Sequence, residues 1–119
     1  MSKNLSLTVR QLAPGTNVID VQGDITGQAE EALQAAYEQA SQDKARAIIL
    51  NLGGLDYMNS SGIGLLVTML IRTQREKQKL LAYGLTTHYQ EIFALTRLNE
   101  AIGIYDSEAA ALTAVATPA

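Results

Sequence analysis

The amino-acid sequence predicts a single α/β domain with a mixed, mostly parallel sheet of about five strands and about four helices. Three observations lead to this prediction. The chain has 119 residues and is 47% hydrophobic, which suits one core of ordinary size. Short runs of aliphatic and β-branched residues alternate with longer segments of helical periodicity. The first two apolar runs have no helical segment between them, whereas each later run follows one.

The first two apolar runs predict a β-hairpin. Residues 5–10 alternate apolar and polar side chains, which is typical of a strand with one exposed face near the edge of a sheet. Residues 13–17 have turn chemistry, and residues 18–21 form the second run. Gly23 is expected to end this strand.

The central strand is expected between two helices. Thr26 can cap the first helix, whose apolar residues keep helical spacing through residue 40. Residues 47–52 form an apolar run rich in β-formers, which predicts a strand buried on both faces. A second helical pattern follows from about residue 61 to 77.

The rest of the chain predicts two further strands and two helices. Residues 80–83 read as a strand ended by Gly84, and Thr87 with Gln90 forms a possible capping box for the third helix. A short last strand is expected at residues 102–105.

The final helix completes the domain. Asp106 or Ser107 is expected to cap it. We therefore expect a domain over residues 1–113 and a frayed carboxyl-terminal tail over residues 114–119.

The composition excludes several classes of protein. The chain has no Cys, which excludes disulfides and thiolate metal sites. Its formal net charge of −3 and pI near 5.0 give no positive field for nucleic acid. The amino terminus lacks the apolar run of a signal peptide, and no stretch reaches the roughly 18 apolar residues of a membrane span. We expect a cytoplasmic protein with no cofactor, no nucleic-acid partner and no membrane span.

Residues 55–64 join the central strand to the second helix and carry adjacent hydroxyls on Ser60 and Ser61. A polar turn at the carboxyl end of a central strand is where open α/β sheets tend to place ligand chemistry. We therefore expect the function of the protein to lie here. A purely structural interpretation stays open, in which one serine caps the helix and Gly62 and Gly64 permit close packing.

Residues 57–64 resemble the phosphorylation-site loop of STAS domains, the fold of bacterial anti-sigma factor antagonists, which usually read aromatic-Met-Asp-Ser-Ser-Gly-Leu-Gly. Residues 23–26 resemble the Gly-Glu-Leu-Asp turn of that family. Residues 92–99 and 104–108 resemble its closing helix and strand, so that the resemblance covers the chain from about 18 to 112. It implies a STAS-like fold and a regulatory module that is not an enzyme.

The same resemblance implies that Ser61 is a phospho-acceptor. In that family, an anti-sigma factor with a histidine-kinase-like ATPase architecture binds the unmodified antagonist, releases its sigma factor, and phosphorylates the serine to end the contact. Physical chemistry is compatible with this role, because a helix amino terminus favours an anion. A phosphate adds about −1.5 to −2 charges, which is costly in a packed contact surface.

A partner-binding surface is expected around this turn. The residues assigned to it are Asp24, Thr26, Tyr57, Met58, Asn59, Ser60, Gly62, Leu65 and Met69. Leu65 and Met69 are included because, at about 100° per residue, they lie opposite the buried face expected for this helix. The residues of that face are Ile63, Leu66, Val67, Leu70 and Ile71. Burial of Leu65 and Met69 under neighbouring helices is the alternative.

Two positions depart from the family pattern. Asn59 and Thr26 stand where the family commonly has Asp, and both changes remove a carboxylate. They favour an alternative function, in which the chain is an adaptor or scaffold STAS domain of a signalling assembly or a lipid transport system and Ser61 is not phosphorylated.

Enzyme classes fit the sequence poorly. Asp56 follows a central strand, as does the phospho-acceptor of a receiver domain, but the accompanying acidic pair and late lysine are not evident. A triad of Ser61, His88 and an aspartate would lack the Gly-x-Ser-x-Gly elbow. A single histidine with scattered carboxylates gives no metal-ligand spacing. The basic positions at 72–79 are interpreted as a solvated helix end.

Overall fold

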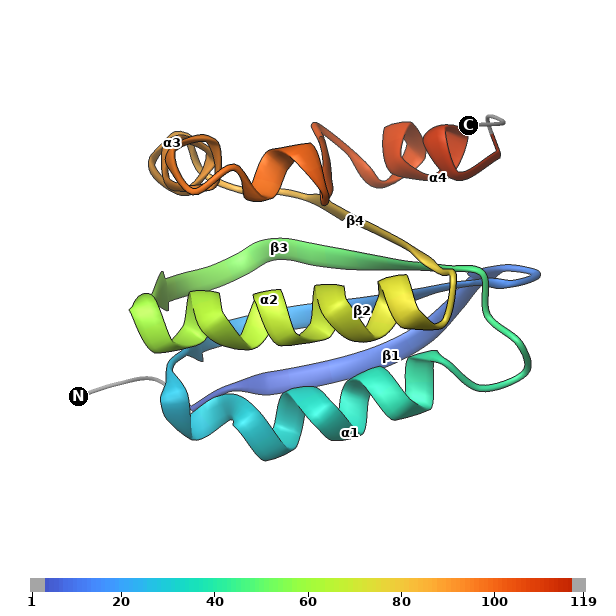
Figure 1. Cartoon of the computed structure of the whole chain (residues 1–119), viewed down its shortest axis with the longest axis horizontal. Coiled ribbons are helices and arrows are strands. Elements are labelled where there is room, and N and C mark those ends of the chain that lie inside the picture. The colour runs from blue at the N-terminus through green and yellow to red at the C-terminus, as the bar shows by residue number, and fades with distance from the viewer. Residues whose placement is uncertain (1–3, 117–119) are drawn as a thin grey trace.

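The structure, a computed structural model, describes residues 4–116 (Figure 1). Its elements are β1 (Ser6–Ala13), β2 (Thr16–Ile25), the 3-10 helix η1 (Gly27–Ala29), α1 (Glu30–Ala40), β3 (Ala47–Met58), α2 (Ser60–Arg75), β4 (Lys79–Tyr83), α3 (Thr87–Leu95), the 3-10 helix η2 (Leu98–Glu100), β5 (Gly103–Tyr105) and α4 (Glu108–Ala116). This order confirms the predicted sequence of strands and helices. Within residues 4–116, no helix has the length and apolar character needed to cross a membrane.

The five strands form one sheet in the order β1-β2-β3-β4-β5. β1 pairs with β2 in antiparallel orientation, and each later pair is parallel. The predicted hairpin and the mixed, mostly parallel sheet are therefore confirmed. Because all later strands run in the direction of β2, the carboxyl ends of β2 and β3 meet at one edge, where the serine pair begins α2.

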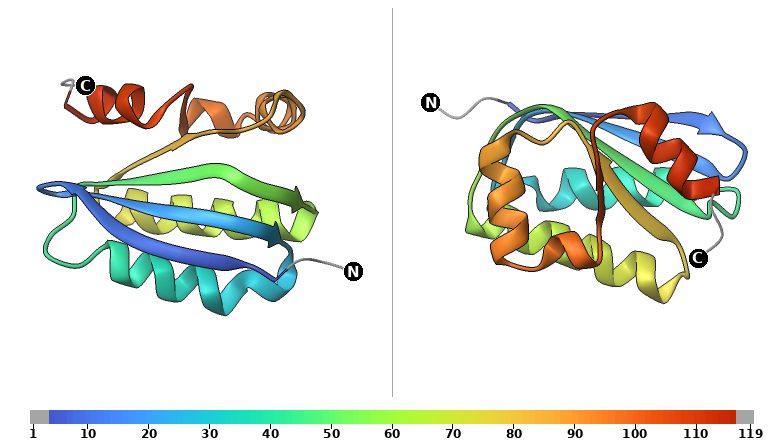
Figure 2. Two further views of the ribbon diagram at one scale, coloured as in Figure 1. Left: turned by 180° about the vertical axis from the view of Figure 1, so that it is seen from behind. Right: turned by 90° about the horizontal axis from the view of Figure 1, so that it is seen from above.

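The sheet separates two cores. α1 and α2 cover one face and α4 covers part of the other, as Figures 1 and 2 show from three sides. The larger core contains Ile48 of β3 with Leu66 of α2 and Phe93 of α3, and the smaller core contains Ile49 of β3 with Ala111 of α4. Because successive strand side chains point to opposite faces, β3 contributes to both cores. This confirms the prediction that the central strand is buried on both faces.

β3 is longer than predicted. The sequence suggested that the strand ends at residue 52 and that a turn begins at residue 55, but the strand continues through Met58. Its last residues pair with the end of β2, where Tyr57 lies opposite Asp24 and Met58 opposite Ile25. Gly53 and Gly54 lie within this strand, although glycine is a weak strand former. Pairing with β2 carries the strand to Met58, but the ladder is irregular at Gly53, whose amide donates to Asn51 Oδ1 at 3.1 Å.

The helix caps differ in detail from the predictions. The expected capping box at Thr87 is wrong by one residue, because the side chain of Thr86 accepts a hydrogen bond from the Tyr89 amide at 3.5 Å. Gln90 donates to the Leu85 carbonyl at 3.0 Å instead of closing the box. Before α4, Ser107 Oγ accepts from the Ala110 amide at 3.1 Å, which identifies the cap among the two expected candidates.

α4 extends into the segment that was expected to be frayed. α4 continues through Ala116, so residues 114–116 of the expected frayed tail are helical. Residues 117–119 lie outside the described part of the chain. Partial burial of Ala114 and Val115 against the smaller core explains why the helix extends this far.

Candidate functional site around Ser61

The serine pair lies on the first turn of α2. Ser60 and Ser61 are its first two residues, and Asn59 is the N-cap. The Oδ1 atom of Asn59 accepts a hydrogen bond from the Gly62 amide at 2.9 Å. The interpretation in which a serine caps this helix is therefore wrong, and so is the placement of the serines in a turn.

The Ser61 hydroxyl is accessible from solvent. Both Ser60 and Ser61 are exposed, and no hydrogen bond within residues 4–116 uses Ser61 Oγ. Gly27 lies beside it, since a Cβ atom built on Gly27 would stand 3.4 Å from Ser61 Cβ and 3.7 Å from its Oγ. Because Gly27 has no side chain, the space beside the Ser61 hydroxyl is open.

The start of α2 is held against the end of β2. A Cβ atom on Gly62 would stand 2.1 Å from the carbonyl oxygen of Ile25, a distance that real atoms do not reach. The Asn59 amide donates to the same carbonyl at 3.4 Å. At Gly64, two residues later and on the other side of the helix, a Cβ atom would meet nothing within 4 Å. Gly62 therefore fixes the position of the helix, whereas Gly64 leaves its outer surface open.

A tyrosine from α3 supports the segment before the serines. The hydroxyl of Tyr89 accepts a hydrogen bond from the buried Met58 amide at 2.9 Å. The side chain of Met58 belongs to the larger core, whereas that of Tyr57 is 50% exposed. The alternation of the strand therefore places Tyr57 on the surface, three residues before the serine pair.

The residues assigned to partner binding fall into three groups. Tyr57 and Ser60 are exposed. Asp24, Thr26, Asn59 and Leu65 are partly buried. Met58, Gly62 and Met69 are buried. The hydroxyl oxygen of Thr26 accepts from the Gln28 amide at 3.4 Å, which confirms its expected capping role, here at η1.

The expected outward position of Met69 is wrong, because this side chain is only 3% exposed. The buried residues of α2 are Gly62, Leu66, Met69, Leu70 and Thr73. They follow the helical spacing that begins at Gly62, whose contact with Ile25 sets the rotation of the helix. Ile71, which was expected in the core, is consequently 49% exposed.

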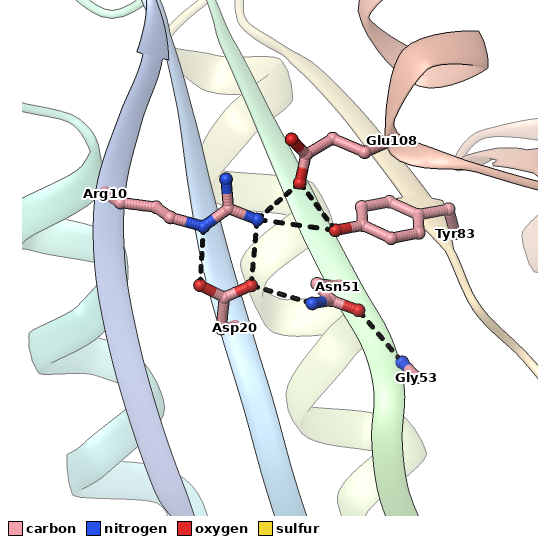
Figure 3. Close-up of polar contacts among 6 residues, drawn as sticks. All are labelled: Arg10, Asp20, Asn51, Gly53, Tyr83 and Glu108. Carbon is pink, nitrogen blue, oxygen red and sulfur yellow. Dashed lines mark hydrogen bonds and ion pairs between the residues drawn. The ribbon is translucent and has the colours of Figure 1, made fainter.

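A polar network that the sequence did not predict joins α4 to the sheet (Figure 3). Arg10 of β1 donates two hydrogen bonds to Asp20 of β2, at 2.7 and 3.1 Å, and also pairs with Glu108, the first residue of α4. The Tyr83 hydroxyl donates to Glu108 at 2.8 Å, and Asn51 donates to Asp20 at 2.7 Å. The two carboxylates therefore share one guanidinium.

The network shifts the titration of its members. Hydrogen bonds from Arg10 lower the pKa of the Asp20 and Glu108 carboxyls, and these carboxylates raise the pKa of Arg10. Burial, with the hydrogen bond to Glu108, raises the pKa of Tyr83 to about 12. Every charge in the network has an opposite partner, which is the pattern of a structural tether.

The described residues give little support for a metal site or for a catalytic role of His88. Within residues 4–116, no three His, Cys, Asp or Glu side chains come together as metal ligands. His88 is exposed on α3, with its ring 5.0 Å from that of Tyr89.

Comparison with known proteins agrees with this fold. The family model described as "Mlab, STAS domain" matches residues 8–106. An anti-sigma factor antagonist from Mycobacterium paratuberculosis is 24% identical, with a TM-score of 0.77 and coverage of 96% of each chain. The phosphorylated form of SpoIIAA, a Bacillus cell fate determinant, is 22% identical, with a TM-score of 0.71 over 92% of this chain and 99% of that one.

A transport protein has the same fold. A sulfate transporter family protein from Wolinella succinogenes is 15% identical, with a TM-score of 0.76 over 89% of this chain and 88% of that one. At these identities the solved structures establish the fold alone.

Proposed function

Because the chain belongs to the STAS domain family, we propose that it acts in the cytoplasm as an anti-sigma factor antagonist and regulates transcription by reversible protein binding. The unmodified protein binds an anti-sigma factor that is a serine kinase of the histidine-kinase-like ATPase type. Phosphorylation of Ser61 then ends the contact. The observation that carries this proposal is the exposed Ser61 hydroxyl on the first turn of α2, where Asn59 has taken over the capping role.

The position of Ser61 suits a phosphate. The first amides of a helix lack intrahelical acceptors, and the helix dipole stabilises an anion there by roughly 0.3–1 kcal/mol. α2 has 16 residues, so its dipole is fully developed. The close contact of Gly62 with Ile25 holds the helix in place. A phosphate would therefore change the charge of the surface by about −1.5 to −2 without unfolding it.

The surface around Ser61 offers contacts for a partner. Tyr57 presents an exposed aromatic ring, and aromatic side chains are enriched in protein interfaces. Ser60 is also exposed, and Gly64 leaves room for another backbone to approach α2. Partly buried Asp24, Thr26, Asn59 and Leu65 complete the proposed contact surface. The buried Met58, Gly62 and Met69 hold it in place from inside.

Phosphorylation is tested with the kinase-like anti-sigma factor encoded by the same organism. The protein is incubated with this factor and ATP, and mass spectrometry locates the added phosphate. We expect one phosphate on Ser61 in the wild type and in Ser60→Ala, the matched control, and none in Ser61→Ala. An unmodified wild type, under conditions in which a known antagonist is modified, would overturn the proposal.

Partner affinity tests the second half of the proposal. Calorimetry should give similar affinities for the wild type and Ser61→Ala, and a weaker one for Ser61→Asp, because a carboxylate adds part of the charge of a phosphate. Equal affinities for all three proteins would place Ser61 outside the interface.

A second candidate function is a STAS adaptor that is not phosphorylated, in a signalling assembly or a lipid transport system. It is favoured by the identity of Asn59 and Thr26, whose neutral side chains cap α2 and η1 and provide no carboxylate at either position. Asn59→Asp separates the two functions. If the kinase modifies this variant and not the wild type, the natural protein is an adaptor.

A further inference from the structure

A hollow of about 690 Å³ lies at the amino ends of β2, β3 and β4, at the opposite end of these strands from Ser61. The β1–β2 turn, the starts of β3 and β4, and the carboxyl-terminal half of α4 form its walls. The lining residues are Ala13, Pro14, Gly15, Thr16, Arg46, Lys77, Lys79, Leu112, Val115 and Ala116. Its volume lies within the range of about 300–1,000 Å³ that is typical of small-molecule sites.

Among residues 4–116, the charged side chains that line this hollow are those of Arg46, Lys77 and Lys79. Arg46 and Lys79 are neighbours across the sheet, since the Lys79 amide donates to the Arg46 carbonyl at 2.9 Å, and Lys77 lies in the preceding loop. The nearby acidic residues Asp43 and Glu76 line other hollows. In a chain with a net charge of −3, this end therefore carries a local positive field that attracts anions.

One cation already has a partner in the wall. Lys79 Nζ donates to the Val115 carbonyl at 3.5 Å, near the carboxyl end of α4. The bond offsets the negative end of the helix dipole, which would otherwise disfavour an anion at this wall.

Thr16 supplies a polar group inside the hollow. It is 3% exposed, and its pairing with Ala47 places its side chain on the α4 face of the sheet. Within residues 4–116, the Thr16 hydroxyl makes no hydrogen bond. It is not fully enclosed, because every fully enclosed side-chain oxygen in these residues has a hydrogen-bond partner. A ligand oxygen could therefore form a hydrogen bond with this hydroxyl at little cost.

The remaining wall is apolar. Pro14 lies on one side, and Leu112 and Val115 of α4 lie on another. We propose that this hollow binds an amphipathic anion, whose carboxylate lies among Arg46, Lys77 and Lys79 and whose alkyl chain lies along α4. This site is separate from Ser61 and does not depend on the function proposed for it.

Ligand specificity is the first test. Sodium decanoate is titrated into the labelled protein and followed by amide chemical shifts, with acetate and 1-decanol in parallel. We expect saturable shifts at Gly15, Arg46 and Leu112, and roughly tenfold weaker binding of acetate and decanol, since each lacks one of the two contacts. If decanol binds as tightly as decanoate, the cations do not contribute to binding. If acetate binds as tightly as decanoate, the apolar wall does not contribute. Either result, or no saturable shift, overturns the proposal.

Charge variants are the second test. We expect the triple change Arg46→Gln, Lys77→Gln, Lys79→Gln to weaken decanoate binding by roughly tenfold or more. The control Lys44→Gln, Arg75→Gln, Arg97→Gln alters net charge equally and lies outside the hollow. Equal affinities of the two triple variants would contradict a site.

Two milder variants keep this test decisive. If circular dichroism shows that the first triple variant is unfolded, Lys77→Gln alone, in an exposed loop, replaces it. Thr16→Val removes the hydroxyl at similar volume and should also weaken decanoate binding. Unchanged binding in Lys77→Gln and Thr16→Val together would overturn the proposal.

Discussion

The side chain of Asn59 caps α2 by accepting a hydrogen bond from the Gly62 amide at 2.9 Å. An asparagine at this position performs the same capping role as an aspartate would, because either side chain presents an oxygen acceptor. The presence of Asn59, where STAS domains commonly have aspartate, therefore leaves the local fold intact and removes one negative charge beside Ser61. Its effect on phosphorylation can be measured separately from its effect on stability.

We expect Asn59→Ala to lower the free energy of unfolding by about 1 kcal/mol, since it removes the cap of α2. Asn59→Asp should retain the stability of the wild type, because it keeps the acceptor. Urea denaturation measures both changes. Ser60→Ala is the control and should have little effect. A loss in Ser60→Ala as large as that in Asn59→Ala would show that the serine contributes the cap.

The two glycines of α2 should respond in opposite ways to the same substitution. Gly62→Ala places a Cβ atom 2.1 Å from the Ile25 carbonyl oxygen, and we expect a loss of about 3 kcal/mol from overpacking. Gly64→Ala meets nothing within 4 Å and should raise stability by about 0.5–1 kcal/mol, because alanine is the better helix former. Thermal and urea denaturation of both variants test this. Similar effects at both positions would contradict the contact described at Gly62.

Removal of the Tyr89 hydroxyl should destabilise the strand before the serines. In Tyr89→Phe, the buried Met58 amide loses its acceptor at 2.9 Å, and we expect a cost of about 1–3 kcal/mol. Tyr57→Phe is the matched control, because Tyr57 is exposed, and its change should stay within about 0.5 kcal/mol. Hydrogen exchange of the Met58 amide should accelerate in Tyr89→Phe alone. Unchanged exchange there would contradict the hydrogen bond.

Stability should depend on pH through Asp20 and Glu108. Arg10 lowers the pKa of both carboxyls in the folded protein, so the unfolded chain binds more protons in the acid range. The stabilisation is complete above the ordinary carboxyl pKa values and is lost as the pH falls through the lower, folded-state values. Glu108→Gln should therefore reduce the fall in melting temperature between about pH 5 and pH 2. Glu100→Gln, outside the network, should not. Equal curves for the two variants would exclude the network as the cause.

Much of the fold follows from hydrophobic periodicity, which specified the hairpin, the buried central strand and the order of the helices. The errors arose where tertiary contacts outweigh local signals. β3 continues beyond residue 52 because residues 54–55 and 57–58 pair with β2. The face of α2 is set by the approach of Gly62 to Ile25, which no helical periodicity contains. Met69 and Ile71 were misplaced for this reason.

The polar network could not be predicted from the sequence, for a different reason. Arg10 and Glu108 are separated by almost the whole chain, and only the docking of α4 on the sheet brings them together. Asp20 gave a weak signal, since it faces the neighbouring strand of a predicted hairpin that carries Arg10. Likewise, the sequence does not show that Thr16 lines a hollow, because the walls of the hollow come from distant segments of the chain.

The length of β3 sets the distance between the Ser61 surface and the hollow beside Arg46. At about 3.3 Å per residue, its 12 residues extend roughly 40 Å, close to the 40 Å long axis of the molecule. Ser61 follows one end of this strand and Arg46 precedes the other. A partner bound at the proposed Ser61 surface would leave the hollow beside Arg46 accessible, so the two proposed sites are compatible with each other. Two elements connect these sites, because α2 also runs from Ser61 to within two residues of Lys77.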